Sequence, residues 1–157
     1  MNSNGIEDEE VNFGKLMIGS DGLKGEEVDF SQLKGKIIVK ILGLKKESRW
    51  ILFVCDDGSE YCLQHHQDCC EYVRIEDIVG DPIDLIGTPI LDCYEGSGPT
   101  VEYEDNVDDF TGGMWTFYNI GTFKGYVTLR WLGESNGCYS EKACFEKIKS
   151  PTEKNKN

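Results

Sequence analysis

MWTFYNI-GTFKG-YVTLRWL, residues 114–132, is the stretch that decides the fold of this 157-residue chain. Both outer runs are rich in aromatic and β-branched side chains, which favour β-strands, and a glycine stands at each end of the five residues between them. Alternate residues of the second run fall on opposite faces of a strand, with Tyr126, Thr128 and Arg130 on one face and Val127, Leu129 and Trp131 on the other. The stretch therefore predicts an antiparallel β-hairpin.

Residues 37–64 predict a three-stranded antiparallel meander upstream of this hairpin. Residues 37–41 are rich in β-branched side chains, and residues 49–55 (RWILFVC) form a more apolar run. The Asp-Asp-Gly-Ser sequence at 56–59 is typical of a tight turn, because glycine accepts a positive φ, and residues 60–64 then return as the third strand.

Short helical segments are expected between the two strand regions. RIEDIV, residues 74–79, has apolar side chains at its second, fifth and sixth positions, the spacing of one helical turn. Residues 83–86 suit a second turn. Residues 88–94 predict another strand, and residues 138–148 predict a final strand or a short helix.

Residues 92–109 carry seven acidic side chains and no basic one. This composition is typical of a long solvated hairpin loop, or of an acidic arm that meets a basic partner. No repeat, heptad or βαβ alternation is visible. The whole pattern predicts an α+β, β-rich fold, in which a twisted antiparallel sheet curls into a half-barrel or small barrel with one or two short helices.

The predicted organisation is a flexible acidic N-terminal arm at 1–30, a single β-rich domain at 31–149 and a disordered tail at 150–157. The formal net charge of −13 disfavours nucleic acid and anionic membrane as direct partners, since both are polyanions. No apolar run is long enough to span a bilayer, and the acidic N-terminus lacks a signal-peptide core. A cytoplasmic location is therefore expected.

The cysteines suggest a metal site as an alternative to buried thiols. Cys62, His65 and Cys69 have the spacing C-x2-H-x3-C, with Cys55 one hairpin away, and such ligands suit tetrahedral zinc. Strand alternation, however, places Cys62 and His65 on opposite faces, and no second ligand pair follows. We therefore expect no cofactor, with zinc as the alternative. A disulfide between the adjacent Cys69 and Cys70 is sterically awkward.

His65, Asp68 and Cys69 also suggest a thiol- or metal-dependent hydrolase, with a cysteine thiolate as nucleophile and a histidine as base. Local structure offers another role for Asp68. It precedes the predicted helical turn at 74–79, and Glu71 follows three residues later, the spacing of a capping box. We therefore expect Asp68 to be the N-cap of a helix, accepting bonds from amides near Glu71.

The loop after the hairpin is the best candidate for a binding site. Trp131 and Tyr139 flank Ser135 and Asn136 in a glycine-bracketed turn, and Arg130 is close by. Such a set suits a planar polar group, with the guanidinium meeting a phosphate or carboxylate. The alternative is that the loop is only a tight turn and the rings are buried.

Two motifs together resemble a family of small uncharacterised phage and prophage proteins. The first is H-x-x-D-C-C-E at residues 65–71, and the second is R-W-x-G-x-S-N-G-x-Y-S at residues 130–140. The resemblance extends over about residues 33–145 and implies a viral origin. The activity of that family is unassigned, so the resemblance implies no mechanism.

These observations predict a non-enzymatic phage accessory protein. It would bind a host protein or a small signalling molecule in the host cytoplasm, and so counter host defence or redirect host machinery. A homodimer through an exposed sheet edge or aromatic face is also expected. The residues expected to contact the ligand or partner are Arg130, Trp131, Ser135, Asn136, Tyr139, His65, Asp68 and Glu71.

Overall fold

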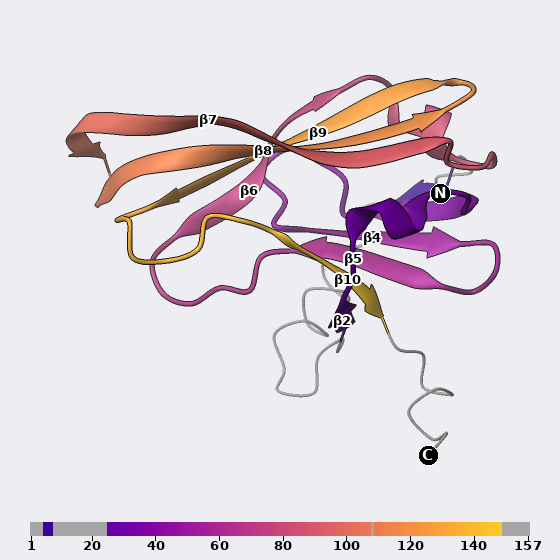
Figure 1. Ribbon diagram of the computed structural model, residues 1–157, viewed down its shortest axis with the longest axis horizontal. Helices are drawn as coiled ribbons and strands as arrows, with labels where there is room; N and C mark the ends of the chain where they lie inside the picture. Colours follow the sequence, from indigo (N-terminus) through magenta and orange to yellow (C-terminus); the bar gives the residue numbers. More distant parts are fainter. Residues whose placement is uncertain (1–4, 8–24, 108, 149–157) are drawn as a thin grey trace, which may run out of the picture.

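The computed structural model describes residues 5–7, 25–107 and 109–148, and its strands form two stacked antiparallel sheets (Figure 1). The first sheet has six strands in the order β1-β3-β4-β5-β10-β2. Their bounds are β1 Ile6–Glu7, β3 Ile38–Leu42, β4 Trp50–Cys55, β5 Glu60–Gln64, β10 Cys144–Ile148 and β2 Gly25–Glu27. Only the short β1 pairs in parallel, with β3. Strands β3, β4 and β5 form the predicted three-stranded meander.

The second sheet has four antiparallel strands in the order β6-β9-β8-β7. Their bounds are β6 Tyr72–Val79, β9 Gly125–Ser135, β8 Phe110–Thr122 and β7 Asp92–Val107. The predicted hairpin is confirmed and is longer than expected, because β8 and β9 pair without interruption from Gly112 opposite Ser135 to Thr122 opposite Gly125. Only Phe123 and Lys124 lie between the last paired residues.

The acidic stretch at 92–109 was expected to be a loop, but it is largely the 16-residue strand β7. It pairs with β8 and forms one edge of the second sheet. Glu95, Glu102 and Glu104 are all exposed. Charged side chains are common on edge strands because they discourage pairing with other chains. The acidic composition of residues 92–107 is therefore that of an edge strand and not of a loop.

The predicted helical turn at 74–79 is also wrong, because these residues belong to strand β6. The pairing of β6 with β9 shifts between Ile75 and Asp77, which is a β-bulge. The extra residue of a bulge interrupts the two-residue period of a strand. Ile75 and Ile78 thus both contact the core at a spacing of three, which imitates a helix.

Helical structure in the described residues is limited to two 3-10 turns, η1 Phe30–Leu33 and η2 Pro82–Leu85. Asp29 and Asp81 cap these turns by accepting bonds from Ser31 N and Ile83 N. The second turn matches the one predicted at 83–86. The prediction of a β-rich antiparallel fold with little helix is confirmed, although the two sheets do not close into a barrel.

The predicted N-terminal arm contributes to the fold. β1 and β2 lie within residues 1–30, and each extends one edge of the first sheet. Residues 1–4 and 8–24 of that arm and the predicted tail at 150–157 lie outside the described residues. No helix in the described part of the chain has the length and apolar character needed to cross a membrane.

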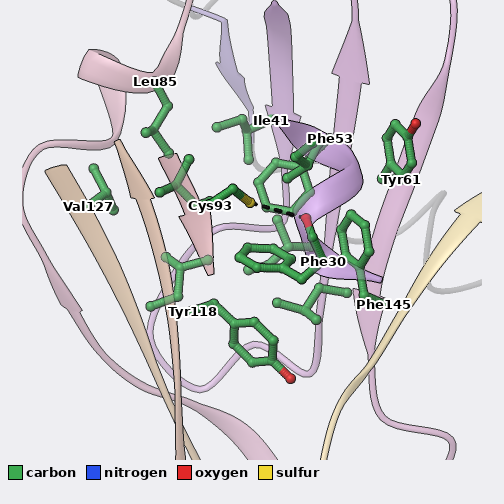
Figure 2. Close-up of a cluster of buried hydrophobic side chains, with 14 of the residues drawn as sticks. Phe30, Ile41, Phe53, Tyr61, Leu85, Cys93, Tyr118, Val127 and Phe145 are labelled. Atoms are coloured by element: carbon green, nitrogen blue, oxygen red, sulfur yellow. Dashed lines mark hydrogen bonds between the residues drawn. The ribbon is translucent and has the colours of Figure 1, made fainter. Parts of the chain in front are cut away.

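The core lies between the two sheets, with the ring of Phe30 near its centre. Figure 2 shows Phe53, Tyr61 and Phe145 from the first sheet facing Cys93, Tyr118 and Val127 from the second. The Phe30 ring makes edge contacts with Tyr118 and with Phe145, both at 5.0 Å between centroids. Its carbonyl accepts a bond from Cys93 Sγ at 3.1 Å. Phe30 therefore packs against residues of both sheets.

We expect Phe30→Ala to lower the free energy of unfolding by about 3–5 kcal/mol, because it leaves a cavity between two packed sheets. Phe123→Ala is the matched control. Phe123 is 74% exposed at the hairpin turn, so its loss should change stability by no more than about 0.5 kcal/mol. Urea unfolding of both variants measures the difference. Equal effects would contradict the assignment of Phe30 to the core.

Candidate functional site

The register of β9 divides the predicted binding residues between two faces of the second sheet. Trp131 is 1% exposed and packs edge-on against Tyr118 at 6.4 Å, inside the core. Arg130 points the other way, as alternation requires. The expectation that both side chains line one pocket is therefore wrong, and Trp131 is a core residue.

The loop after β9 uses its polar groups to hold its own turn. Ser135 is buried, and its Oγ accepts a bond from Gly137 N at 2.9 Å. Asn136 Oδ1 accepts one from Cys138 N at 3.0 Å. Gly137 has a φ of 92°, a conformation that favours glycine. Tyr139 is half-buried. The alternative interpretation of this loop, a tight turn, fits Ser135 and Asn136.

Arg130 lies instead among aromatic side chains of β8. Its guanidinium carbon is 4.9 Å from the centre of the Trp115 ring and 5.5 Å from that of Phe117. Asp77 Oδ2 is 3.3 Å from the same group, and the Arg130 side chain is still 38% exposed. A guanidinium over aromatic faces is held by cation–π attraction. Counting outward equally from the turn at 123–124 would have identified Phe117 as the residue opposite Arg130.

The same outer surface of the second sheet carries further exposed rings. Tyr94 is 51% exposed and Tyr126 is 57% exposed, and Tyr126 donates its hydroxyl to Asp92 at 2.8 Å. A Cβ at Gly98 in β7 would lie 2.7 Å from the Phe117 ring and from Trp115 Cβ, so this glycine leaves room for both. We call this surface the Arg130 face, defined by Arg130, Trp115, Phe117, Tyr94 and Tyr126.

A buried pair of polar side chains, His65 and Glu71, lies in the segment that connects β5 of the first sheet to β6 of the second. His65 Nδ1 lies 2.7 Å from the Lys142 carbonyl, which can only accept, so Nδ1 carries a proton. His65 Nε2 lies 3.5 Å from Glu71 Oε1, and these two side chains are 5% and 0% exposed. Burial alone would raise the pKa of Glu71, but hydrogen bonds from the amides of Asp68 and Cys69, together with the nearby His65 ring, lower it below its ordinary value.

The predicted capping role of Asp68 is wrong, because no helix follows it. The amides of Asp68 and Cys69 instead donate to Glu71 Oε1, at 2.6 and 3.1 Å. Glu71 thus reaches back to the amide three residues earlier, as in a capping box, but within a bend that leads into β6. Asp68 itself is exposed. The acceptor that orders this segment is Glu71.

The proposed zinc ligands are not brought together. Cys62 packs in a cluster with Leu42, Leu52 and Ile148, whereas His65 follows the end of β5 and lies beside Glu71. Cys69 forms a disulfide with Cys70, contrary to expectation. Both lie in the bend between β5 and β6, where strand alternation does not separate their side chains. No group of three or more His, Cys, Asp or Glu residues in the described ranges could hold a metal ion.

A family model described as a domain of unknown function (DUF7448) matches residues 31–145. This range includes both the Arg130 face and the His65–Glu71 pair. No curated protein and no solved structure matches the chain.

Glu71→Gln should lower the free energy of unfolding at neutral pH by about 1 kcal/mol or more, because a neutral oxygen replaces a charged acceptor. A lowered pKa in the folded state means that the carboxylate contributes fully above its ordinary pKa, and this contribution disappears as the pH falls through the folded value. The variant should therefore lose less stability than the wild type on acidification, as measured by urea unfolding across pH.

Asp68→Ala is the control for this prediction. Its exposed side chain should contribute less than about 0.5 kcal/mol. A loss equal to that of Glu71→Gln, or identical acid profiles for Glu71→Gln and the wild type, would contradict the role assigned to Glu71.

Proposed function

The chain belongs to the DUF7448 family, a domain of unknown function, and from its geometry we propose that it is a non-enzymatic binding protein whose contact surface is the Arg130 face. The observation that carries the proposal is the position of Arg130 across the rings of Trp115 and Phe117 on the outer surface of a sheet. Contact with a partner or ligand would cover rings that now meet water.

Arginine, tryptophan and tyrosine are the residues that contribute most to protein interfaces. In this face the guanidinium is already held by two rings and by Asp77, so little side-chain freedom is lost on binding. Asp77 offsets part of the positive charge. The group that binds must therefore offer more than charge, and a planar polar group bearing a carboxylate or phosphate meets both the rings and the guanidinium.

The partner that fits the resemblance to phage proteins is a component of an infected host cell, either a protein or a small signalling molecule. Binding it in the host cytoplasm would counter a defence or redirect host machinery. Net charge of −13 makes nucleic acid a poor partner for the molecule as a whole. A homodimer through the Arg130 face is a further arrangement that the same residues would support.

The alternative, a hydrolase centred on His65, Asp68 and Cys69, has no support from the geometry. His65 is directed at Glu71, and Cys69 is bonded to Cys70. A thiolate next to an imidazole, which that mechanism needs, is not assembled by these residues.

We expect Arg130→Ala to weaken binding of the host component at least about tenfold, the loss typical of an interface arginine. Asn136→Ala is the matched control, because it alters a turn outside the Arg130 face and should lower only the melting temperature. Immobilised wild-type protein and both variants are exposed to host lysate and metabolite extract, and the enriched component is then titrated against each by calorimetry.

Equal affinity of wild type and Arg130→Ala would contradict the proposal, as would reproducible absence of any component that the wild type enriches. Light scattering detects self-association.

A further inference from the structure

The bend between β5 and β6 carries a disulfide between neighbouring residues, Cys69 and Cys70, which we call the vicinal pair. All seven cysteines lie in the described ranges, and the other five are free. Both residues of the vicinal pair are exposed. An external thiolate can therefore approach the bond, and access to a sulfur atom is the first requirement for thiol–disulfide exchange.

The position of the bond argues against a role in holding the fold together. In the chain-entropy view, a disulfide stabilises a protein by closing a loop in the unfolded chain, and the effect grows with the length of that loop. The vicinal pair joins adjacent residues, so it closes the shortest loop that the chain can form. Reduction should therefore leave the two packed sheets intact.

The other cysteines offer no equivalent site. Cys55, Cys62 and Cys93 are buried, and burial raises the pKa of each thiol, which disfavours the reactive thiolate. Cys144 is half-buried, and burial raises its pKa as well. Cys138 is the single free cysteine in the described ranges that is exposed. Exchange in the folded protein is thus concentrated at the vicinal pair, and Cys138 provides a control.

The backbone of Cys69 takes part in the hydrogen bonds that order the bend. Its N–H donates to Glu71 Oε1 at 3.1 Å, and its carbonyl accepts a bond from Gln67 Nε2 at 3.1 Å. Gln67 Nε2 also donates to the Glu71 carbonyl at 2.7 Å. A ring closed through two adjacent side chains restricts the backbone between them, so opening this ring returns conformational freedom to Cys69.

The same bonds connect the vicinal pair to the junction of the two sheets. Glu71 Oε1 lies 3.5 Å from His65 Nε2, and His65 Nδ1 donates to the Lys142 carbonyl in the loop before β10. Strand β6 begins directly after Glu71. A change at Cys69 is therefore one hydrogen bond away from the residue that orders the passage from β5 to β6.

We propose that the vicinal pair is a reversible thiol–disulfide exchange site, at which a small monothiol of the glutathione class loosens the bend without unfolding the protein. The thiolate of the monothiol attacks one sulfur of the pair, the S–S bond breaks, and the other cysteine leaves as a thiolate that takes up a proton. A second thiolate then attacks the monothiol sulfur of this mixed disulfide and releases the first cysteine, which is also protonated. The pair gains two electrons and two protons, and two monothiols become one disulfide. The reverse sequence restores the bond.

The first test is equilibration of the folded protein in buffers with different ratios of reduced to oxidised glutathione. After an acid quench, free thiols are alkylated and located by peptide mass spectrometry. We expect the vicinal pair to gain both alkyl groups in one transition as the ratio rises, and Cys138→Ser to give the same transition. The melting temperature of the reduced protein should differ by less than about 3 °C from that of the oxidised protein.

Amide hydrogen exchange of 15N-labelled protein tests whether the bend responds. Relative to the intrinsic rates of each redox form, the amides of Asp68 and Cys69 should exchange at least about tenfold faster after reduction, because local opening becomes easier. The amides of β8 and β9 should not change. The double variant Cys69→Ser with Cys70→Ser lacks the bond, so it should show the faster exchange in oxidising and reducing buffer alike.

The proposal is overturned if both cysteines stay thiols in oxidised glutathione, or if the bond is reduced only after the protein has unfolded. Equal protection of the Asp68 and Cys69 amides in the two redox forms, or slow exchange in the double variant, would also overturn it. Arg130→Ala should leave the glutathione transition unchanged, so the outcome is independent of the function proposed for the Arg130 face.

Discussion

The register between β8 and β9 is the constraint on which the rest of the structure depends. It pairs Phe117 with Arg130 and Tyr118 with Leu129, so that one face of the hairpin enters the core and the other meets water. A shift by one residue would exchange the faces, because side chains alternate along a strand. Arg130 would then be buried without a partner, and Trp131 would be exposed. The core and the candidate binding surface therefore follow from a single pairing, which the short turn at Phe123 and Lys124 helps to set.

Two other contacts fix how the second sheet meets the first. Phe30 fills the space between them and touches Tyr118 on one side and Phe145 on the other. Glu71 orders the bend between β5 and β6, where the chain passes from one sheet to the other, by accepting hydrogen bonds from two backbone amides and by lying beside His65. Both side chains are buried. The ring partners of Phe30 lie far along the chain, whereas the partners of Glu71 belong to its own segment. The segment at 65–71, which is rich in His, Cys and acidic residues, therefore has a structural role, in which Glu71 is the acceptor that orders the bend.

Features encoded locally could be predicted from the sequence. The alternation around Leu129 predicted the central hairpin, and the β-branched and apolar runs at 37–64 predicted the meander of β3, β4 and β5. Strand β6 was not predicted, because its bulge gives Ile75 and Ile78 an apolar spacing that resembles a helical turn. Strand β7 was not predicted along its full length, because edge strands and loops both tolerate many charged side chains. The partners of Arg130 required knowledge of register across the hairpin. Likewise, no local pattern reveals that Glu141 is brought against Gly133, or that β2 pairs with β10.

The most direct test of this account is the set of cross-strand nuclear Overhauser contacts between β8 and β9 in the free protein. We predict contacts that link Phe117 with Arg130 and Asn119 with Thr128, together with contacts from the Trp115 ring to the Arg130 side chain. Contacts shifted by one residue, pairing Phe117 with Leu129 or with Trp131, would contradict it, because the Arg130 face could not then exist.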